Sequence, residues 1–181
     1  MKRLGAIIAG GQSLRFGGDK GAALLNGIAL IDHVANALRP QVDALIIVGR
    51  EWSGLVSIAD APAPRLGPLG GLNAALTYAQ TNGYDEVITA GCDTLPIPNN
   101  LLSLLTGVPS VVAEHYLIGR WPSNLASALV EHLASQSDRS MRGWLAACAA
   151  QMIPVPQPFY NLNTPEALAA FAANSFSAEQ P

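Results

Sequence analysis

The sequence is poor in cysteine and in charge, and both shortages exclude whole classes of protein. Its two cysteines, Cys92 and Cys148, are widely separated. They are too few and too isolated for a disulfide framework or a zinc site. The formal net charge of −3 provides no general attraction to nucleic acid. We therefore expect no nucleic-acid partner, and any bound anion must be held by local geometry.

Long apolar runs are also missing. No stretch approaches the ~20 residues that a membrane-spanning helix needs. The basic start at residues 1–3 superficially resembles a signal peptide, but Gly10 and Arg15 interrupt the following apolar run after only ~6 residues. Half of the residues are hydrophobic, which favours a compact fold over disorder. We predict a cytoplasmic protein without a membrane partner, one domain over residues 1–181, and a frayed tail over 174–181.

Lysine is scarce as well, and this makes one lysine conspicuous. Apart from Lys2 near the terminus, the only lysine is Lys20, in the most glycine-rich loop of the chain. This loop follows the apolar run Leu4–Ala9, which is typical of a strand buried on both faces. The adjacent Gly10 and Gly11 permit a sharp turn and let backbone N–H groups approach an anion, while Arg15 and Lys20 add positive charge. The loop therefore predicts a polyphosphate site.

The loop matches neither of the common nucleotide motifs. Five residues separate Gly11 from Gly17, and Asp19 stands between the last glycine and Lys20, which excludes the P-loop spacing. Because Gly10 and Gly11 are adjacent, the dinucleotide fingerprint is excluded too. A tight strand-to-helix connection with no ligand is the alternative explanation. The position of the single internal lysine favours the phosphate site.

Apolar runs and helical faces alternate along the chain, which predicts an α/β fold. Strands linked by helices form parallel sheets with right-handed crossovers, and ligands gather at the carboxyl ends of the strands. We expect Glu114–Pro122, which is polar and aromatic, to be an irregular insertion that lines a substrate pocket or forms a surface loop. The predicted strands are Leu4–Ala9, Ala44–Val48, Leu55–Ile58, Glu86–Ala90, Ser110–Ala113 and Met152–Val155, and helices are predicted near 30–38, 67–79, 99–105, 125–133, 141–148 and from 164.

Acidic residues follow two of the predicted strands. Asp60 comes after the third strand and Asp93 after the fourth. A carboxylate at such a strand end, beside a phosphate loop, is a natural ligand for Mg²⁺. For Asp93 alone, a helix cap or an Asx-turn is the simpler explanation. Gly70, in the first turn of a predicted helix, costs about 1 kcal/mol there, and either tight packing on the sheet or a ligand at the helix amino terminus accounts for it.

Four motifs follow one another over nearly the whole chain. They are IAGGQSLRFGGDK from Ile8 to Lys20, GPLGG from Gly67 to Gly71, CDT from Cys92 to Thr94, and NLNTPE from Asn161 to Glu166. Together they resemble the bacterial molybdenum cofactor guanylyltransferases, and the set is far more specific than any one motif. The resemblance implies a Rossmann-like, three-layer nucleotidyltransferase fold with a mostly parallel central sheet flanked by helices. It also implies transfer of GMP from GTP to molybdenum-bound molybdopterin, with release of pyrophosphate and a requirement for Mg²⁺.

The resemblance also implies roles for individual residues. Arg15, Lys20 and Asp93 would be catalytic, with Arg15 on the phosphates and Asp93 as the metal ligand. Asn161 and Asn163 match a motif beside the pterin and the metal. Because these two asparagines alternate along the chain, one can face the site while the other fastens the loop. The expected GTP-binding set is Ile8, Ala9, Gly10, Gly11, Lys20, Asp60, Gly70 and Asp93, and further partners expected of such a protein are molybdoenzymes and cofactor-assembly proteins.

Related cytidylyltransferases typically carry Ala-Ala-Gly where this chain has Ala9-Gly10-Gly11, and they lack the Gly-Pro-Leu-x-Gly segment, so guanine is favoured. Two positions depart from the family pattern. The family often has a nucleotide-contacting asparagine where this chain offers Val48 or Gly49, and relatives often have histidine where Trp121 precedes Pro122. These departures bear on base recognition and on the pterin pocket, respectively.

Two other functions are open at this point. The first is a nucleotidyltransferase of the same fold that uses another acceptor, such as a sugar phosphate, or that uses CTP. The second is a nucleotide-binding adaptor in cofactor delivery that has lost catalysis. Retention of Lys20 and Asp93 argues against the adaptor.

Overall fold

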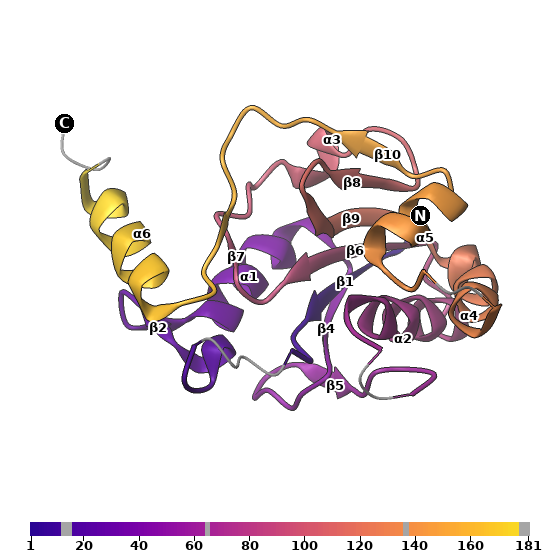
Figure 1. Ribbon diagram of the computed structural model, residues 1–181, viewed down its shortest axis with the longest axis horizontal. Coiled ribbons are helices and arrows are strands. Elements are labelled where there is room, and N and C mark those ends of the chain that lie inside the picture. Colours follow the sequence, from indigo (N-terminus) through magenta and orange to yellow (C-terminus); the bar gives the residue numbers. More distant parts are fainter. Residues whose placement is uncertain (12–15, 64–65, 136–137, 178–181) are drawn as a thin grey trace.

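A seven-stranded sheet forms the centre of the protein. The computed structural model describes residues 1–11, 16–63, 66–135 and 138–177, and Figure 1 shows the sheet running across the molecule. The order across the sheet is β10 (Gln151–Ile153), β8 (Ser110–Val112), β9 (His115–Pro122), β6 (Glu86–Gly91), β1 (Arg3–Ile8), β4 (Ala44–Val48) and β5 (Val56–Ile58).

Most neighbouring strands in this sheet are parallel, as the sequence predicts, and β9 is the exception. It pairs antiparallel with both β6 and β8, so the prediction of an irregular insertion over Glu114–Pro122 was wrong. Ile118 and Trp121 are fully buried in this strand. Arg120 obscures the strand pattern in the sequence, but its Nη2 donates to Glu86 Oε1 at 2.8 Å, so its charge is compensated inside the sheet.

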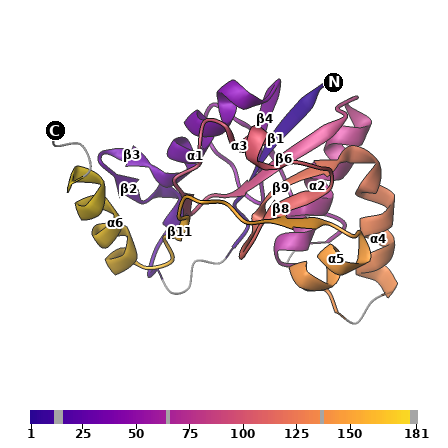
Figure 2. The same ribbon diagram turned by 90° about the horizontal axis from the view of Figure 1, so that it is seen from above.

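Helices cover both faces of the sheet, giving three layers (Figure 2). Helices α1 (Leu30–Leu38) and α3 (Leu101–Leu104) contribute to one hydrophobic cluster, and α2 (Pro68–Thr81), α4 (Ala126–Ser135) and α5 (Met141–Ala147) to the other. Each central strand alternates between them, because side chains of successive residues point to opposite faces. In β1, for example, Ile7 joins the cluster of α1, and Leu4 and Ile8 join that of α2.

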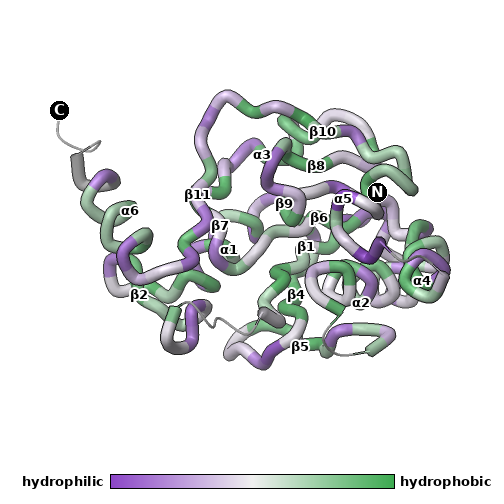
Figure 3. The backbone as a smooth tube through the Cα atoms, in the orientation of Figure 1, coloured by the Kyte–Doolittle hydropathy of each residue, from purple (hydrophilic) through white to green (hydrophobic). Residues whose placement is uncertain are grey.

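This double burial explains the uninterrupted apolar runs of the sequence. Figure 3 shows such a run in β4, which is hydrophobic along its whole length. Among the helices that the structure describes, none is long and apolar enough to cross a membrane.

Two small antiparallel pairs lie outside the main sheet, and the sequence did not predict them. One joins β2 (Leu24–Leu25) to β3 (Ile28–Ala29), and the other joins β7 (Thr94–Leu95) to β11 (Tyr160–Asn161). Figure 1 shows the segment after β10 crossing back over the molecule to reach this second pair. The C-terminal part of the chain is thereby attached beside the end of β6.

The last helix, α6, spans Pro165–Ser177. Its start is the one that the sequence predicts, because Thr164 Oγ1 accepts a hydrogen bond from Ala167 N at 3.2 Å. The helix extends past Asn174, the residue at which the sequence predicts a frayed tail to begin. Residues 178–181 lie outside the described residues.

Candidate active site

A cavity of about 350 Å³ opens at the carboxyl ends of β1, β4 and β6. Backbone loops, one helix amino terminus and four charged residues, Lys20, Arg50, Asp60 and Asp93, surround it. It brings together seven of the residues that the sequence singled out. Arg15 lies outside the described residues, so its predicted position on the phosphates stays a prediction. The seven that line the cavity are Ile8, Ala9, Gly10, Gly11, Lys20, Asp60 and Asp93.

Glycines pack the ends of β1, β4 and β5 tightly together. Gly49 adopts a φ of +89°, and a Cβ added to it would lie 2.4 Å from Gly10 Cα. A Cβ on Gly10 would in turn lie 2.9 Å from Asp60 Oδ2, so the glycine loop passes directly beside that carboxylate. This close approach explains the departure at residues 48–49, because Val48 is buried and an asparagine at position 49 would collide with the loop.

Asp60 is held in a confined place behind this loop. Its burial raises the pKa of the carboxyl group. Gly70 packs behind Asp60, since a Cβ on Gly70 would lie 3.6 Å from Asp60 Cβ and 3.0 Å from Leu66 Cβ. Gly70 is not among the described residues that line the cavity. Of the two explanations for this glycine, its neighbours therefore support tight packing.

The amino terminus of α2 nevertheless faces the cavity. Gly67, with a φ of +64°, precedes Pro68 at the first helical position, and both residues line the cavity. A helix amino terminus carries partial positive charge and favours anions or polar groups that accept hydrogen bonds. The helix end that the sequence singled out therefore lies at the cavity, and ligand binding by Gly70 stays a prediction.

Lys20 and Asp93 meet across the cavity. Lys20 Nζ donates to Asp93 Oδ2 at 2.5 Å and to Asn163 Oδ1 at 2.9 Å. Only 16% of the Lys20 side chain and 15% of the Asp93 side chain are exposed. Lys20 begins the short 3-10 helix η1 (Lys20–Ala22) after the glycine loop, whereas Asp93 follows β6. The first loop, the fourth predicted strand and the C-terminal motif therefore converge on one cluster.

The two asparagines of the C-terminal motif divide their contacts as the sequence predicts. Asn163 faces Lys20, while Asn161 Oδ1 accepts a hydrogen bond from Thr94 Oγ1 at 2.9 Å. The backbone adds another link, since Leu162 N donates to the carbonyl of Asp93 at 2.8 Å. Asn161 thus fastens the segment that presents Asn163 to Lys20.

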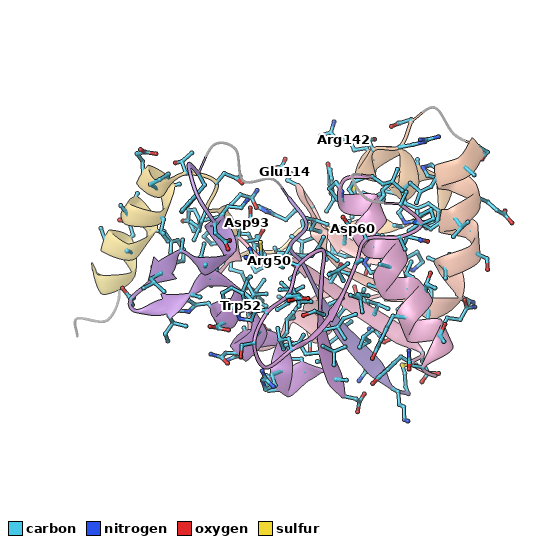
Figure 4. All side chains as sticks on the ribbon, turned by 90° about the horizontal axis from the view of Figure 1, so that it is seen from below. Arg50, Trp52, Asp60, Asp93, Glu114 and Arg142 are labelled. Carbon is cyan, nitrogen blue, oxygen red and sulfur yellow. The ribbon has the colours of Figure 1, made fainter. Side chains whose placement is uncertain are left out.

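Arg50 and Cys92 are lining residues that the sequence analysis missed or set aside. Figure 4 shows Arg50 near Asp93, with Asp60 on the side of α2. Arg50 follows Gly49 at the end of β4, so the rule that found Asp60 and Asp93 also indicates it. Cys92 is not a nucleophile, because burial raises the pKa of its thiol to about 11 and the thiol stays protonated at neutral pH.

Trp121 does not alter the cavity. It is fully buried in β9, and its Nε1 donates to Thr89 Oγ1 at 2.9 Å. The departure from the family pattern at this position therefore lies in the core of the sheet and not among the described residues that line the cavity. Leu117, from the same strand, does line the cavity.

The site offers one carboxylate suited to a divalent cation. Within the described part of the chain, no group of three His, Cys, Asp or Glu side chains is placed to hold a metal ion alone. Mg²⁺ usually binds proteins through one or two carboxylates, together with substrate phosphates and waters. Asp93 beside a phosphate-type loop fits that mode, in which the nucleotide supplies the remaining ligands.

Comparison with known proteins identifies the family. A family model described as the MobA-like NTP transferase domain matches residues 5–152. The chain is 34% identical to the molybdenum cofactor guanylyltransferase of Rhodobacter capsulatus, over 93% of this chain and 94% of that protein. It is 36% identical to a molybdenum cofactor guanylyltransferase of Cereibacter sphaeroides, over 93% of this chain and 95% of that protein. The chain belongs to the molybdenum cofactor guanylyltransferase family.

Family membership confirms the resemblance noted in the sequence and makes the chain a nucleotidyltransferase. Solved structures confirm the fold. The molybdopterin-guanine dinucleotide biosynthesis protein A of Archaeoglobus fulgidus matches with a TM-score of 0.71 at 20% identity, over 97% of this chain and 99% of that one. A UDP-glucose pyrophosphorylase from Acinetobacter baumanii matches with a TM-score of 0.66 at 12% identity, over 100% and 95%. Both solved structures share the fold of this chain.

Proposed function

We propose that this guanylyltransferase transfers GMP from GTP to the phosphate of molybdenum-bound molybdopterin in the cytoplasm, releasing pyrophosphate. One observation carries the proposal: Lys20 and Asp93 meet at a cavity that the glycine loop borders, and Asn163 binds Lys20 there. The names of the relatives indicate the nucleotide and the acceptor. Molybdoenzymes and other cofactor-assembly proteins would then receive the product.

The proposed reaction is an in-line displacement. An oxygen of the acceptor phosphate attacks the α-phosphorus of GTP, and the bond to the β-phosphate oxygen breaks as pyrophosphate leaves. The attacking oxygen is already ionised at neutral pH, so no side-chain nucleophile is needed. Asp93 would hold Mg²⁺, which neutralises negative charge on the phosphates.

The chain itself would align the reactants and stabilise the developing charge. The backbone N–H groups around Gly10 and Gly11 would contact the phosphates, with Arg15 beside them, and Lys20 would exchange its contact with Asp93 for one with the triphosphate. We place guanine at Asp60, because a carboxylate accepts the hydrogen bonds that the N1–H and 2-amino groups of guanine donate. Asn163 would border the acceptor.

Substitution of the two central residues tests this mechanism. We expect Lys20→Ala and Asp93→Ala each to lower turnover by about 10²–10³-fold, since removal of one electrostatic group from an active site typically costs that much. Pyrophosphate release from GTP, with Mg²⁺ and molybdenum-loaded molybdopterin, measures the loss. Matched controls are Lys2→Ala and Glu131→Ala, which remove the same sign of charge at exposed positions. Near-normal turnover in either central variant, with the fold verified by circular dichroism, would refute the assignment.

The same assay separates the competing functions. Faster pyrophosphate release with CTP, or with a sugar phosphate as acceptor, would favour another nucleotidyltransferase of this fold. GTP binding without pyrophosphate release in the presence of the complete substrate set would favour the adaptor.

A further inference from the structure

Arg50 pairs with Asp19 through both ends of its guanidinium group. Arg50 Nη1 donates to Asp19 Oδ1 at 2.6 Å, and Nη2 donates to Oδ2. Two parallel, charge-assisted hydrogen bonds fix the relative orientation of the partners more firmly than a single contact does. The pair also lowers the pKa of Asp19, so the carboxylate stays ionised at neutral pH. Asp19 is the residue immediately before Lys20.

Further contacts hold the guanidinium group itself in place. It lies over the ring of Trp52, 5.4 Å from the ring centre. Trp52 Nε1 in turn donates to Asp32 Oδ1 at 2.8 Å, and Asp32 belongs to α1. On the other side, a Cβ added to Gly21 would lie only 2.7 Å from Arg50 Nη1. A continuous series of contacts therefore leads from α1 through Trp52 and Arg50 to the backbone beside Lys20.

Asp19 determines how the helix η1 is oriented. Its backbone carbonyl and its Oδ1 both accept hydrogen bonds from Ala22 N, at 3.2 and 3.3 Å. Helix η1 is only three residues long, so few bonds of its own hold it, and the cap at Asp19 accounts for much of its order. The direction of the Lys20 side chain depends on this short helix.

We propose that Arg50 is a positioning residue that clamps Asp19 and thereby aims Lys20 at Asp93 and the phosphates. The catalytic consequence rests on the proposed function, whereas the clamp itself does not. Arg50 acts through Asp19 and not on the substrate, because its two terminal nitrogens already bind that carboxylate. Lysine cannot replace it, since an ammonium group lacks the planar fork that binds both carboxylate oxygens.

A double-mutant cycle tests the route of action. We expect Arg50→Gln and Asp19→Asn each to lower kcat/KM by about tenfold, and the double variant to be less than about threefold worse than either single one, because both changes break the same pair. Arg50→Lys should lose activity like Arg50→Gln. Multiplication of the two single effects, to about a hundredfold, would mean that Arg50 acts on the substrate directly and would overturn the proposal.

Hydrogen exchange tests the clamp without any catalysis. In Arg50→Gln, amides of residues 17–23 should exchange at least about tenfold faster than in the unaltered protein, while the strands of the sheet keep their protection. Arg39→Gln is the matched control, since Arg39 is exposed and lies in η2 (Arg39–Gln41). Unchanged exchange at 17–23 in folded Arg50→Gln would overturn the clamp. If the exchange result holds but the unaltered protein transfers no GMP, the proposed function fails and the clamp stands.

Discussion

Asp60 illustrates, at the scale of single residues, how a carboxylate at the cavity is kept at the expense of stability. Burial raises the pKa of its carboxyl group, so the folded chain holds the proton more tightly than the unfolded chain does. Between the unfolded and the folded pKa the folded state therefore binds more protons, and stability falls as pH rises through that interval. At neutral pH the ionised carboxylate is a destabilising group that the site retains.

From this sign we expect Asp60→Asn to melt at a slightly higher temperature than the unaltered protein at pH 7. The difference should shrink as the pH falls toward the ordinary carboxyl range, where both side chains are neutral. Thermal unfolding followed by circular dichroism at several pH values measures this. GTP affinity, measured by calorimetry, should fall by about tenfold, as for the loss of a hydrogen bond to a charged group. A lower melting temperature for Asp60→Asn at pH 7 would contradict the conclusion that the ionised carboxylate destabilises the fold.

The sequence predicted some residues of the site and not others for a clear physical reason. Lys20, Asp60 and Asp93 were found because each stands next to a strand end or in a glycine loop, which local sequence reveals. The role of Arg50 depends on its partner Asp19, 31 positions away, and no local pattern indicates that pairing. Likewise, the lack of space at Gly49 comes from Gly10, a neighbour only in the folded chain.

At the scale of elements, the pair of β7 and β11 attaches the C-terminal motif to the end of β6. Asn161 fastens the pair and Asn163 contacts Lys20, so the two substitutions to alanine should have different effects. We expect Asn161→Ala to lower the free energy of unfolding by about 1 kcal/mol through loss of its hydrogen bond. Asn163→Ala should leave stability nearly unchanged but lower turnover by about tenfold. Urea unfolding and pyrophosphate release, measured on both variants, separate the two; equal effects on stability would contradict this division.

Elements differed in how well the sequence predicted them. The runs that became β1, β4 and β6 were clear because burial on both faces requires uninterrupted apolar residues. Strand β9 was missed because it carries Arg120, whose charge is compensated by Glu86 on a neighbouring strand. The strands of the two small pairs are only two residues long, which is too short for a recognisable pattern of alternating hydrophobic residues. Tertiary contacts determine where they form.

At the scale of the whole molecule, Glu86 links three strands of the sheet. Only 6% of its side chain is exposed, and it pairs with Arg3 Nε at 3.2 Å and with Arg120 Nη2 at 2.8 Å. Glu86 begins β6 and faces Arg3 at the start of β1, so this network lies at the opposite end of these strands from the cavity. The charge network around Glu86 and the proposed catalytic site thus lie at opposite ends of these strands.

We therefore expect Glu86→Ala to lower the free energy of unfolding by about 3 kcal/mol, because removing one partner leaves buried charges uncompensated. Urea unfolding measures this, with the exposed Glu131→Ala as the control. Turnover of Glu86→Ala well below its melting temperature should match that of the unaltered protein. A loss of turnover in folded Glu86→Ala would contradict the conclusion that the charge network and the proposed catalytic site act independently.

The sequence predicted the fold of the whole molecule but not the course of the chain after the last strand of the sheet. The alternation of strands and helices indicated the layers, and the order of the four motifs indicated the family. The chain returns from β10 to β11, which pairs with β7. The sequence did not predict this return, because only the folded sheet brings these segments near each other. That return is what completes the site.

The contact between Lys20 and Asn163 joins residues 143 positions apart, and this separation has a consequence for biosynthesis. On the ribosome, the glycine loop and its lysine are made early, long before the asparagine that binds the lysine. A nascent chain therefore cannot assemble the complete pocket until translation has passed Asn163. Substrate capture at full strength is thus delayed until the ribosome has made the segment that carries Asn163.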